Sequence, residues 1–259
     1  MKAMLHDVSR CTGCLQCVET CSLENGLVEK GADVRFKPGD LSAQRFTTLK
    51  RTKDGRFVRM QCLHCLEPSC VSACLVGAIT RHEDGQVVYN ADMCIGCRYC
   101  MLACPAHVIR YEWDTALPFV QKCDLCYDRE GGPACAEACP YDVSIYGERD
   151  ELLSIAHERI RANPEKYEQK VWGEFDMGGT GVMYISDTPL DHFWPESLGN
   201  TSIPSITWPI ANKTPILALG VAGFLVGASW VINRRNKLAE EQAKEAEQVE
   251  QAPAAAEED

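Results

Sequence analysis

Sixteen cysteines fall into four groups of four, and their thiols are the side chains of this chain best suited to chemistry. In each group, two residues separate the first two cysteines and three separate the last two. The middle spacing is two residues in groups one and three, four in group two and eight in group four. The groups are Cys11, Cys14, Cys17 and Cys21; Cys62, Cys65, Cys70 and Cys74; Cys94, Cys97, Cys100 and Cys104; and Cys123, Cys126, Cys135 and Cys139. No cysteine is left over.

Thiolates at this spacing are typical ligands of iron-sulfur clusters. Three thiolates that are two residues apart wrap one cubane from a single loop, and the fourth ligand comes from a distant segment. Pro105 and Pro140 follow the last cysteines of groups three and four, as in bacterial ferredoxins. Because all sixteen ligands are cysteine, we predict four complete 4Fe-4S clusters and no three-iron cluster.

Two other uses of cysteine compete with this interpretation. Disulfides suit an even number of cysteines, but residues three apart in overlapping triplets are poor partners for one another. Zinc ribbons use two pairs of cysteines separated by a longer spacer, and a third cysteine in the same turn has no role in a tetrahedral site. Both alternatives are therefore disfavoured.

Composition limits the class of protein. Aromatic residues make up 8% of the chain, and the segment that carries the cysteines is short for four cofactors. Metal ligation must therefore replace much of the apolar core, and we expect the protein without iron to be largely unfolded. The formal net charge of −11 makes nucleic acid an improbable partner, so we predict no nucleic-acid binding.

The elements around the cysteines follow the ferredoxin pattern of cluster loop, short helix and β-hairpin. Residues 1–150 form the predicted cluster domain, with an insertion at 22–61. Asp54-Gly55 predicts a hairpin turn within 45–60, and Asp84-Gly85 predicts another within 78–89. Short strands are expected at 108–111, 143–146 and 182–186, and a helix after residue 150. The rest of 151–213 is expected to be a glycine-rich turn and an extended tether.

The C-terminal part contains one predicted transmembrane helix. No charged residue lies between Lys213 and Arg234, and residues 214–233 are long enough to span a bilayer. The basic cluster after this helix places the acidic tail, 234–259, in the cytoplasm and the cluster domain on the periplasmic side of the inner membrane. Residues 1–10 contain no apolar run and no twin arginine, so export is expected to depend on a partner.

Four ferredoxin-type cysteine groups, the sequence GGTGVMYISDTPL and one C-terminal anchor resemble the membrane-anchored iron-sulfur subunits of formate dehydrogenase N and hydrogenase 2. These belong to the wider family of the dimethyl sulfoxide reductase electron-transfer subunits. The resemblance implies an α+β fold of two tandem bacterial-ferredoxin-like modules. It also implies a catalytic partner of molybdopterin, hydrogenase or cytochrome type, and an integral membrane subunit that interacts with quinone. The absence of a twin arginine departs from the hydrogenase 2 type, and Ser22 and Leu75 stand where proline follows the last cysteine elsewhere.

The resemblance also implies how the ligands are shared, with groups one and four forming one pair of clusters and groups two and three the other. The implied sets are Cys11, Cys14, Cys17 and Cys139; Cys123, Cys126, Cys135 and Cys21; Cys62, Cys65, Cys70 and Cys104; and Cys94, Cys97, Cys100 and Cys74.

The resulting hypothesis is an electron-transfer subunit without catalytic residues of its own. Its clusters relay electrons between a catalytic subunit and a quinone or cytochrome subunit of a respiratory complex, and the C-terminal helix contacts lipid. His64 is a candidate hydrogen-bond donor to a cluster sulfur, while Lys122 and Arg98 are candidates for stabilising reduced clusters by charge. Two alternatives stay open: a free-standing, membrane-tethered polyferredoxin, and the same fold with electrons flowing in the opposite direction.

Overall fold

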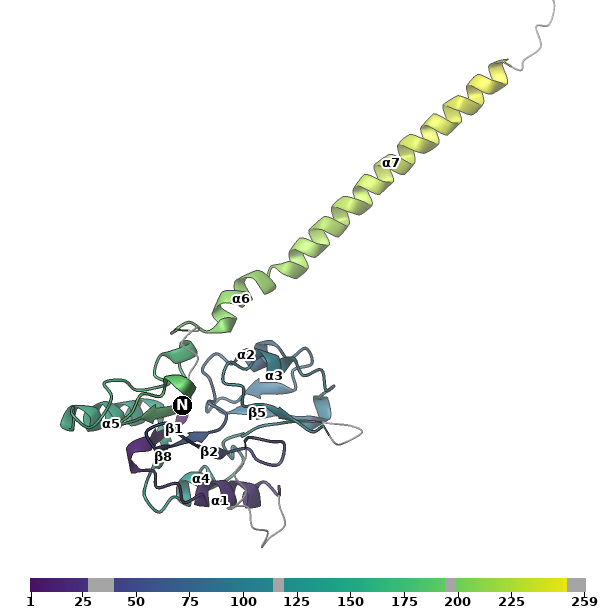
Figure 1. Cartoon of the computed structure of the whole chain (residues 1–259). Coiled ribbons are helices and arrows are strands. Elements are labelled where there is room, and N and C mark those ends of the chain that lie inside the picture. Colours follow the sequence, from purple (N-terminus) through teal and green to yellow (C-terminus); the bar gives the residue numbers. More distant parts are fainter. Residues whose placement is uncertain (28–39, 114–118, 194–198, 251–259) are drawn as a thin grey trace, which may run out of the picture. The chain divides into compact units, whose positions relative to one another are not determined.

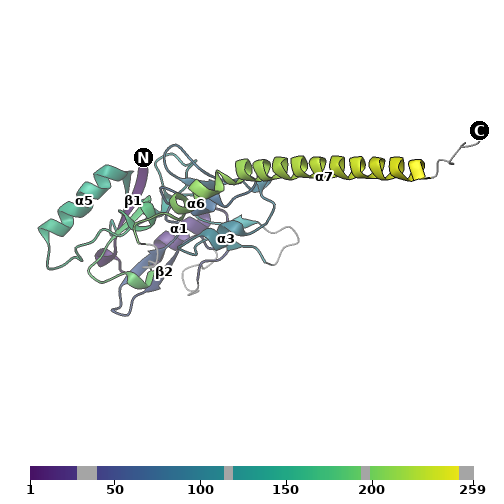
Figure 2. The same cartoon turned by 90° about the horizontal axis from the view of Figure 1, so that it is seen from above.

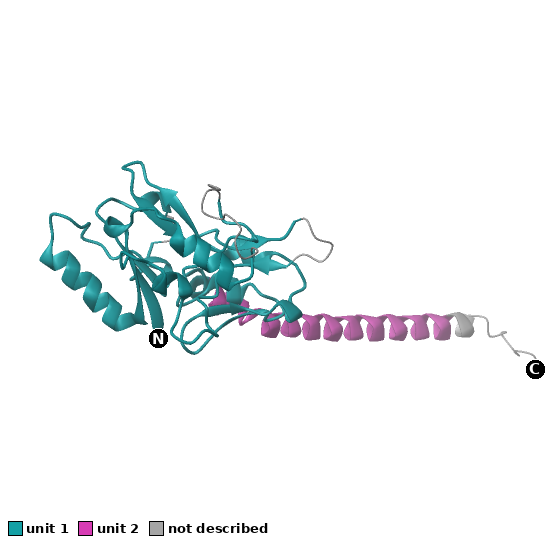
Figure 3. Cartoon of the chain, turned by 90° about the horizontal axis from the view of Figure 1, so that it is seen from below, with its two compact units in different colours: residues 1–206 teal, residues 207–259 magenta. Residues whose placement is uncertain are grey.

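The computed structural model describes residues 1–27, 40–113, 119–193 and 199–250. The chain divides into two compact units, residues 1–206 and 207–259 (Figure 3). Parts of the predicted insertion (28–39), tether (194–198) and tail (251–259) lie outside the described residues.

A three-stranded sheet organises the first unit, and its central strand was not predicted. Strand β1 (Lys2–Asp7) pairs antiparallel with β8 (Ser144–Glu148) and parallel with β9 (Val182–Ile185). Helix α5 (Arg149–Ala162) packs on this sheet (Figures 1 and 2). Ala3 and Leu5 join the α5 side of the core, whereas Met4 joins the core that contains cysteines. Because successive side chains of a strand point to opposite faces, the two faces of this sheet contribute to two different cores.

Three two-stranded hairpins carry the chain between cysteine groups. They are β2 (Thr48–Arg51) with β3 (Phe57–Met60), β4 (Ile79–Arg81) with β5 (Val87–Tyr89), and β6 (Arg110–Tyr111) with β7 (Val120–Gln121). The first two confirm the hairpins predicted from Asp54-Gly55 and Asp84-Gly85. Gly55 and Gly85 have φ values of 87° and 100°, which glycine adopts without steric cost. The predicted strands near 108–111, 143–146 and 182–186 correspond to β6, β8 and β9.

Four short helices each carry cysteines. They are α1 (Gln16–Glu24), α2 (Ser69–Ser72), α3 (Tyr99–Ala103) and α4 (Ala134–Glu137). Helix α1 packs against α4, and α2 against α3 (Figure 1). Groups one and four therefore lie next to each other in space, although they are at opposite ends of the cysteine-bearing segment. Groups two and three, which lie between them in the sequence, are next to each other as well. Single turns of 3-10 helix occur at Val8–Arg10, Ala91–Met93, Asp176–Gly178 and Asp191–Phe193.

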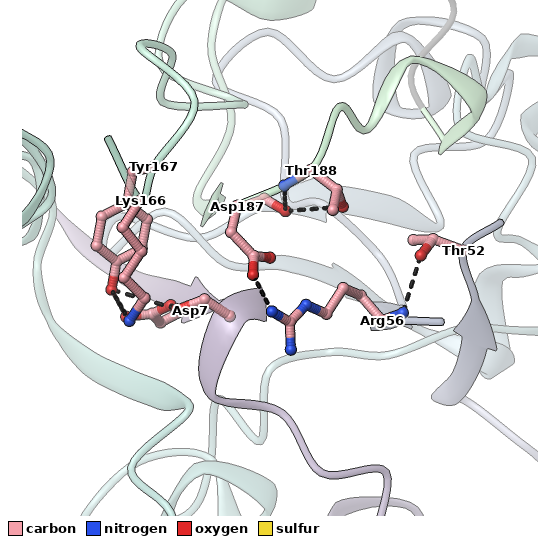
Figure 4. A network of polar contacts seen from close by, with 9 residues as sticks. Asp7, Thr52, Arg56, Lys166, Tyr167, Asp187 and Thr188 are labelled. Atoms are coloured by element: carbon pink, nitrogen blue, oxygen red, sulfur yellow. Dashed lines mark hydrogen bonds and ion pairs between the residues drawn. The ribbon is translucent and has the colours of Figure 1, made fainter. Parts of the chain in front are cut away.

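Polar contacts tie the sheet to the segments around it (Figure 4). Asp7 is 1% exposed, and its carboxylate accepts hydrogen bonds from Tyr167 Oη at 2.9 Å and Arg159 Nη1 at 3.1 Å. Arg56, in the turn between β2 and β3, forms an ion pair with Asp187 just after β9. Because these charged groups are paired, the segments that they join are fixed next to β1 and β9.

The C-terminal region is helical. Helix α6 (Ile203–Ala211) lies within the range expected to be an extended tether, so that expectation was wrong for these residues. The tether expectation relied on its prolines. Pro204 falls in the first turn of α6, where a missing N–H costs no hydrogen bond, whereas Pro209 lies inside the helix and removes one backbone donor. Helix α7 (Thr214–Glu250) contains the predicted span and continues into the charged tail, a length of about 55 Å. The segment Ile203–Ala246 is long and apolar enough to cross a membrane.

Candidate metal centres

The loop between the first two cysteines has the same backbone turn in all four groups. The residue just before the second cysteine has a positive φ: Gly13 (76°), His64 (49°), Gly96 (68°) and Leu125 (64°). This turn directs backbone N–H groups towards the first thiol. Gly96 N donates to Cys94 Sγ at 3.4 Å, and Leu125 N donates to Cys123 Sγ at 3.4 Å. Such N–H to sulfur bonds stabilise a thiolate ligand and help to set cluster potential.

The loops place the thiols in four neighbourhoods. One cavity is lined by Cys11, Cys14 and Cys17 of group one together with Cys139 of group four. Cys11 interacts electrostatically with both Cys139 and Cys14. We call this set site 1; it brings together ligands that are more than a hundred residues apart in the sequence.

Electrostatic contacts between thiols outline the other three sets. The thiols acting on Cys21 include those of Cys135 and Cys126, and Cys123 also interacts with Cys21 and Cys135. We call Cys123, Cys126, Cys135 and Cys21 site 2. Cys65 interacts with Cys62, Cys104 and Cys70, which together form site 3. Cys100 interacts with Cys97, Cys74 and Cys94, which together form site 4.

Burial makes these thiols poor anions unless a cation binds them. It raises the pKa of Cys70 to about 12 and the pKa of Cys100 and Cys126 to about 11. Neighbouring thiols add to each rise because a second thiolate nearby repels the first. Iron ions reverse this penalty because they bind the deprotonated form.

The donor set suits a cubane. All sixteen cysteines are described, and all are free thiols. Within the described ranges, no three His, Cys, Asp or Glu side chains converge closely enough to hold a single metal ion. A cubane is larger and takes one thiolate on each of four irons, so thiols spaced around a cavity such as that of site 1 fit it. A bound 4Fe-4S cluster supplies reversible one-electron transfer.

Comparison with known proteins agrees with this chemistry. Residues 53–149, which contain groups two, three and four, match the family model of a 4Fe-4S dicluster domain. The Hydrogenase-2 operon protein HybA of Escherichia coli O157:H7 is 30% identical, over 90% of this chain and 84% of that protein. The iron-sulfur subunit of the nitrate-inducible formate dehydrogenase of Escherichia coli strain K12 is 32% identical, over 89% and 83%. The chain belongs to this family of iron-sulfur subunits.

Family membership confirms that the chain is an electron-transfer iron-sulfur subunit of the kind found in oxidoreductase complexes, and not a catalytic subunit. It also confirms the 4Fe-4S chemistry and the ferredoxin-like domain with mixed helices and strands. Among the described residues, one C-terminal helix is long and apolar enough to cross a membrane.

Of the three side chains predicted to tune the clusters in this iron-sulfur subunit, Lys122 and His64 are buried and Arg98 is exposed. Lys122 is 5% exposed, and its Nζ donates to the carbonyl oxygen of Cys123 at 2.8 Å. His64 is buried, and its Nδ1 accepts from Val87 N at 2.9 Å, so its Nε2 carries the proton; this atom is buried without a partner among the described residues, and its donation to a cluster sulfur stays a prediction. The guanidinium of Arg98 lies at the surface, 5.0 Å from the ring centre of Tyr111.

The sequence interpretation missed one buried cation of the iron-sulfur subunit. Arg59, on β3, is 4% exposed and lines the cavity of site 1. It lies three residues before Cys62, but β3 carries it to the thiols of groups one and four. No local sequence signal marks such a residue, since an arginine in a hairpin strand is ordinarily solvated.

Proposed function

We propose that this subunit relays electrons through four 4Fe-4S clusters, held at sites 1 to 4, between a catalytic subunit and a membrane subunit that interacts with quinone or cytochrome. The ligand sets are those implied by the family resemblance. In each transfer, one cluster loses an electron and becomes oxidised, and the next cluster gains that electron and becomes reduced. No bond forms or breaks. The polypeptide acts as ligand, spacer and insulator.

The main support for the proposal is the order in which the four sites follow one another. Cys17 of site 1 interacts with Cys135 of site 2, Cys123 of site 2 with Cys62 of site 3, and Cys70 of site 3 with Cys100 of site 4. These interactions between thiols of different sites support a single line from site 1 to site 4. Sites 1 and 2 form one ferredoxin-like module and sites 3 and 4 the other, with the second module nested in sequence within the first.

Exposure supports the same order. Of the sixteen cysteines, the two classed as exposed are Cys14 and Cys97. Cys14 belongs to site 1 and Cys97 to site 4, which are the two ends of the line. Electrons must enter and leave where a partner's redox group can approach, so exposure at both ends and burial between them suit a relay between two partners.

The proposed setting is the inner membrane, with a single span at 214–233, the acidic tail 234–259 in the cytoplasm and the cluster domain on the periplasmic side. Lys213 stands alone on one side of the span, while Arg234, Arg235 and Lys237 follow it on the other. The catalytic partner is of molybdopterin, hydrogenase or cytochrome type, and lipid surrounds the helix.

Gentle solubilisation of membranes tests the proposal against the free-standing carrier. We expect the tagged full-length chain to be recovered with a catalytic subunit and a membrane subunit, and with about sixteen iron atoms per chain. Recovery of the chain alone, with full iron content, would favour the polyferredoxin carrier. Recovery with partners but about eight irons would reject the four-cluster relay. The direction of flow follows from which partner's substrate reduces the clusters.

Charge at the junction of sites 2 and 3 gives a separate prediction. The charge of Lys122 acts on the Cys70 thiol of site 3, and its Nζ donates a hydrogen bond to the carbonyl oxygen of Cys123 in site 2. Because a buried cation favours the reduced, more negative cluster, Lys122→Met should lower the potentials of these two clusters. Redox titration followed by electron paramagnetic resonance measures the shift.

Arg98→Asn is the matched control for Lys122→Met. Arg98 is also a cation next to a ligand, but solvent screens it, and asparagine tolerates its φ of 64°. We expect the potential of the cluster at site 4 to change little in this variant. Equal shifts in both variants would contradict the role of burial.

A further inference from the structure

Arg59 is held rigidly in the interior of the first unit. Its Nε donates to Thr47 Oγ1 at 2.9 Å and its Nη1 donates to Ser144 Oγ at 3.4 Å. Thr47 precedes β2 and Ser144 begins β8, so two segments of the fold hold the guanidinium in place. Its Nη2 is also buried.

The guanidinium lies at the junction of sites 1 and 2. Arg59 lines the cavity formed by Cys11, Cys14, Cys17 and Cys139 of site 1. Burial lowers the pKa of Arg59, but the thiols of Cys135, Cys17 and Cys21 raise it on balance. Cys17 belongs to site 1, whereas Cys135 and Cys21 belong to site 2. The thiols that act on this cation, which are thiolates once a cluster binds them, therefore come from both sites.

A permanent buried charge at this place has a definite electrostatic effect. Arginine stays protonated, so its charge does not depend on the state of the clusters. Each reduction adds one negative charge to a cluster, and a nearby cation in a water-poor interior stabilises that charge more than it would at the surface. Because its bonds to Thr47 and Ser144 hold the guanidinium in place, this stabilisation requires little rearrangement.

We infer that Arg59 is an electrostatic bridge between sites 1 and 2, which raises the reduction potentials of both clusters. The inference rests on the proposed four-cluster relay and assigns a specific tuning residue within it. Lys122 stands at the next junction along the line, so the two buried cations act on different pairs of clusters.

Arg59→Met tests the inference in the full-length subunit within its membrane complex. Methionine removes the charge and fills much of the space. We expect the equilibrium constants for reduction of the clusters at sites 1 and 2 to fall at least tenfold, which is about 59 mV for a one-electron couple. The clusters at sites 3 and 4 should keep their potentials. Redox titration with electron paramagnetic resonance resolves the centres, and iron analysis confirms that they are loaded.

Full loading with unchanged potentials at sites 1 and 2 would overturn the inference, and so would an equal shift at all four sites. A wild-type protein with fewer than four clusters would instead reject the proposed relay, so the two failures are distinct. If the Arg59→Met variant does not bind its clusters, the Arg59→Lys variant tests the inference instead, because lysine keeps the positive charge. Loading of the lysine variant, with potentials within threefold of wild type in equilibrium constant, supports a charge effect. Failure of both variants would show that the shape of arginine is needed, and would overturn the bridge.

Discussion

Cys97→Ala is expected to remove or convert the cluster at site 4 while leaving the signals of sites 1 and 2 largely intact. Cys97 follows Gly96, whose φ of 68° places it on the turn that presents the group-three thiols. Alanine supplies no ligand for one iron of the cubane. The variant should therefore contain about twelve to fifteen irons where the full subunit has about sixteen, depending on whether the whole cluster or one iron is lost.

Cys14→Ala is the matched control for Cys97→Ala. Both cysteines are the second of their group and both are exposed, yet they belong to opposite ends of the proposed line. Each variant should alter one terminal cluster and spare the other. Iron analysis and electron paramagnetic resonance of fully reduced samples provide the readout. If the two variants lost the same centre, the assignment of ligands to sites 1 and 4 would be wrong.

Loss of signal from every centre in either variant would carry a different meaning. It would indicate that cluster loading and folding are one cooperative event. A conservative pair, Cys97→Ser and Cys14→Ser, separates the two explanations because a serine oxygen can bind iron in place of sulfur. Recovery of the remaining centres in the serine variants would point to cooperative folding, and continued loss would reject the ligand sets.

The sequence predicted those features that local chemistry decides. Hairpins at Asp54-Gly55 and Asp84-Gly85 are set by two-residue turns, and the cysteine loops by the spacing that a cubane needs. The apolar run after Lys213 is long enough to indicate a candidate membrane span by itself. Each of these signals is complete within a few residues, or within one uninterrupted segment.

Features decided by distant contacts were missed. Strand β1 begins at the second residue and has no turn signal before it, and it becomes central because β8 and β9 pair with its two edges. His64 and Leu125 adopt the left-handed turn that glycine adopts in the other two groups, because the ligands around them require that turn. Arg59 is buried between two cluster sites only after groups one and four have come together.

Removal of iron is expected to unfold the two cores that contain cysteines and to spare the third. Cys21 and Cys135 belong to the core around Met4, and Cys62, Cys70, Cys100, Cys104 and Cys123 to the core around Ile79. Without iron, these buried thiols become neutral and the bonds that join distant segments are lost. Helices α2, α3 and α4 are one turn each and cannot persist by themselves.

The core between α5 and the sheet has a different composition. Ala3, Leu5, Leu152, Ala156 and Met183 pack there without any cysteine.

Anaerobic chelation of the full-length subunit, followed by hydrogen exchange, should therefore raise exchange at least tenfold in α2, α3 and α4, which is about 1.4 kcal/mol of lost protection. Amides of β1 and α5 should keep more of theirs. Because β1 also contacts the cysteine core through the side chain of Met4, its amides should lose more protection than those of α5. Reconstitution with iron and sulfide serves as the control and should restore exchange everywhere. Uniform loss of protection through α5 would show that the clusters support the entire unit.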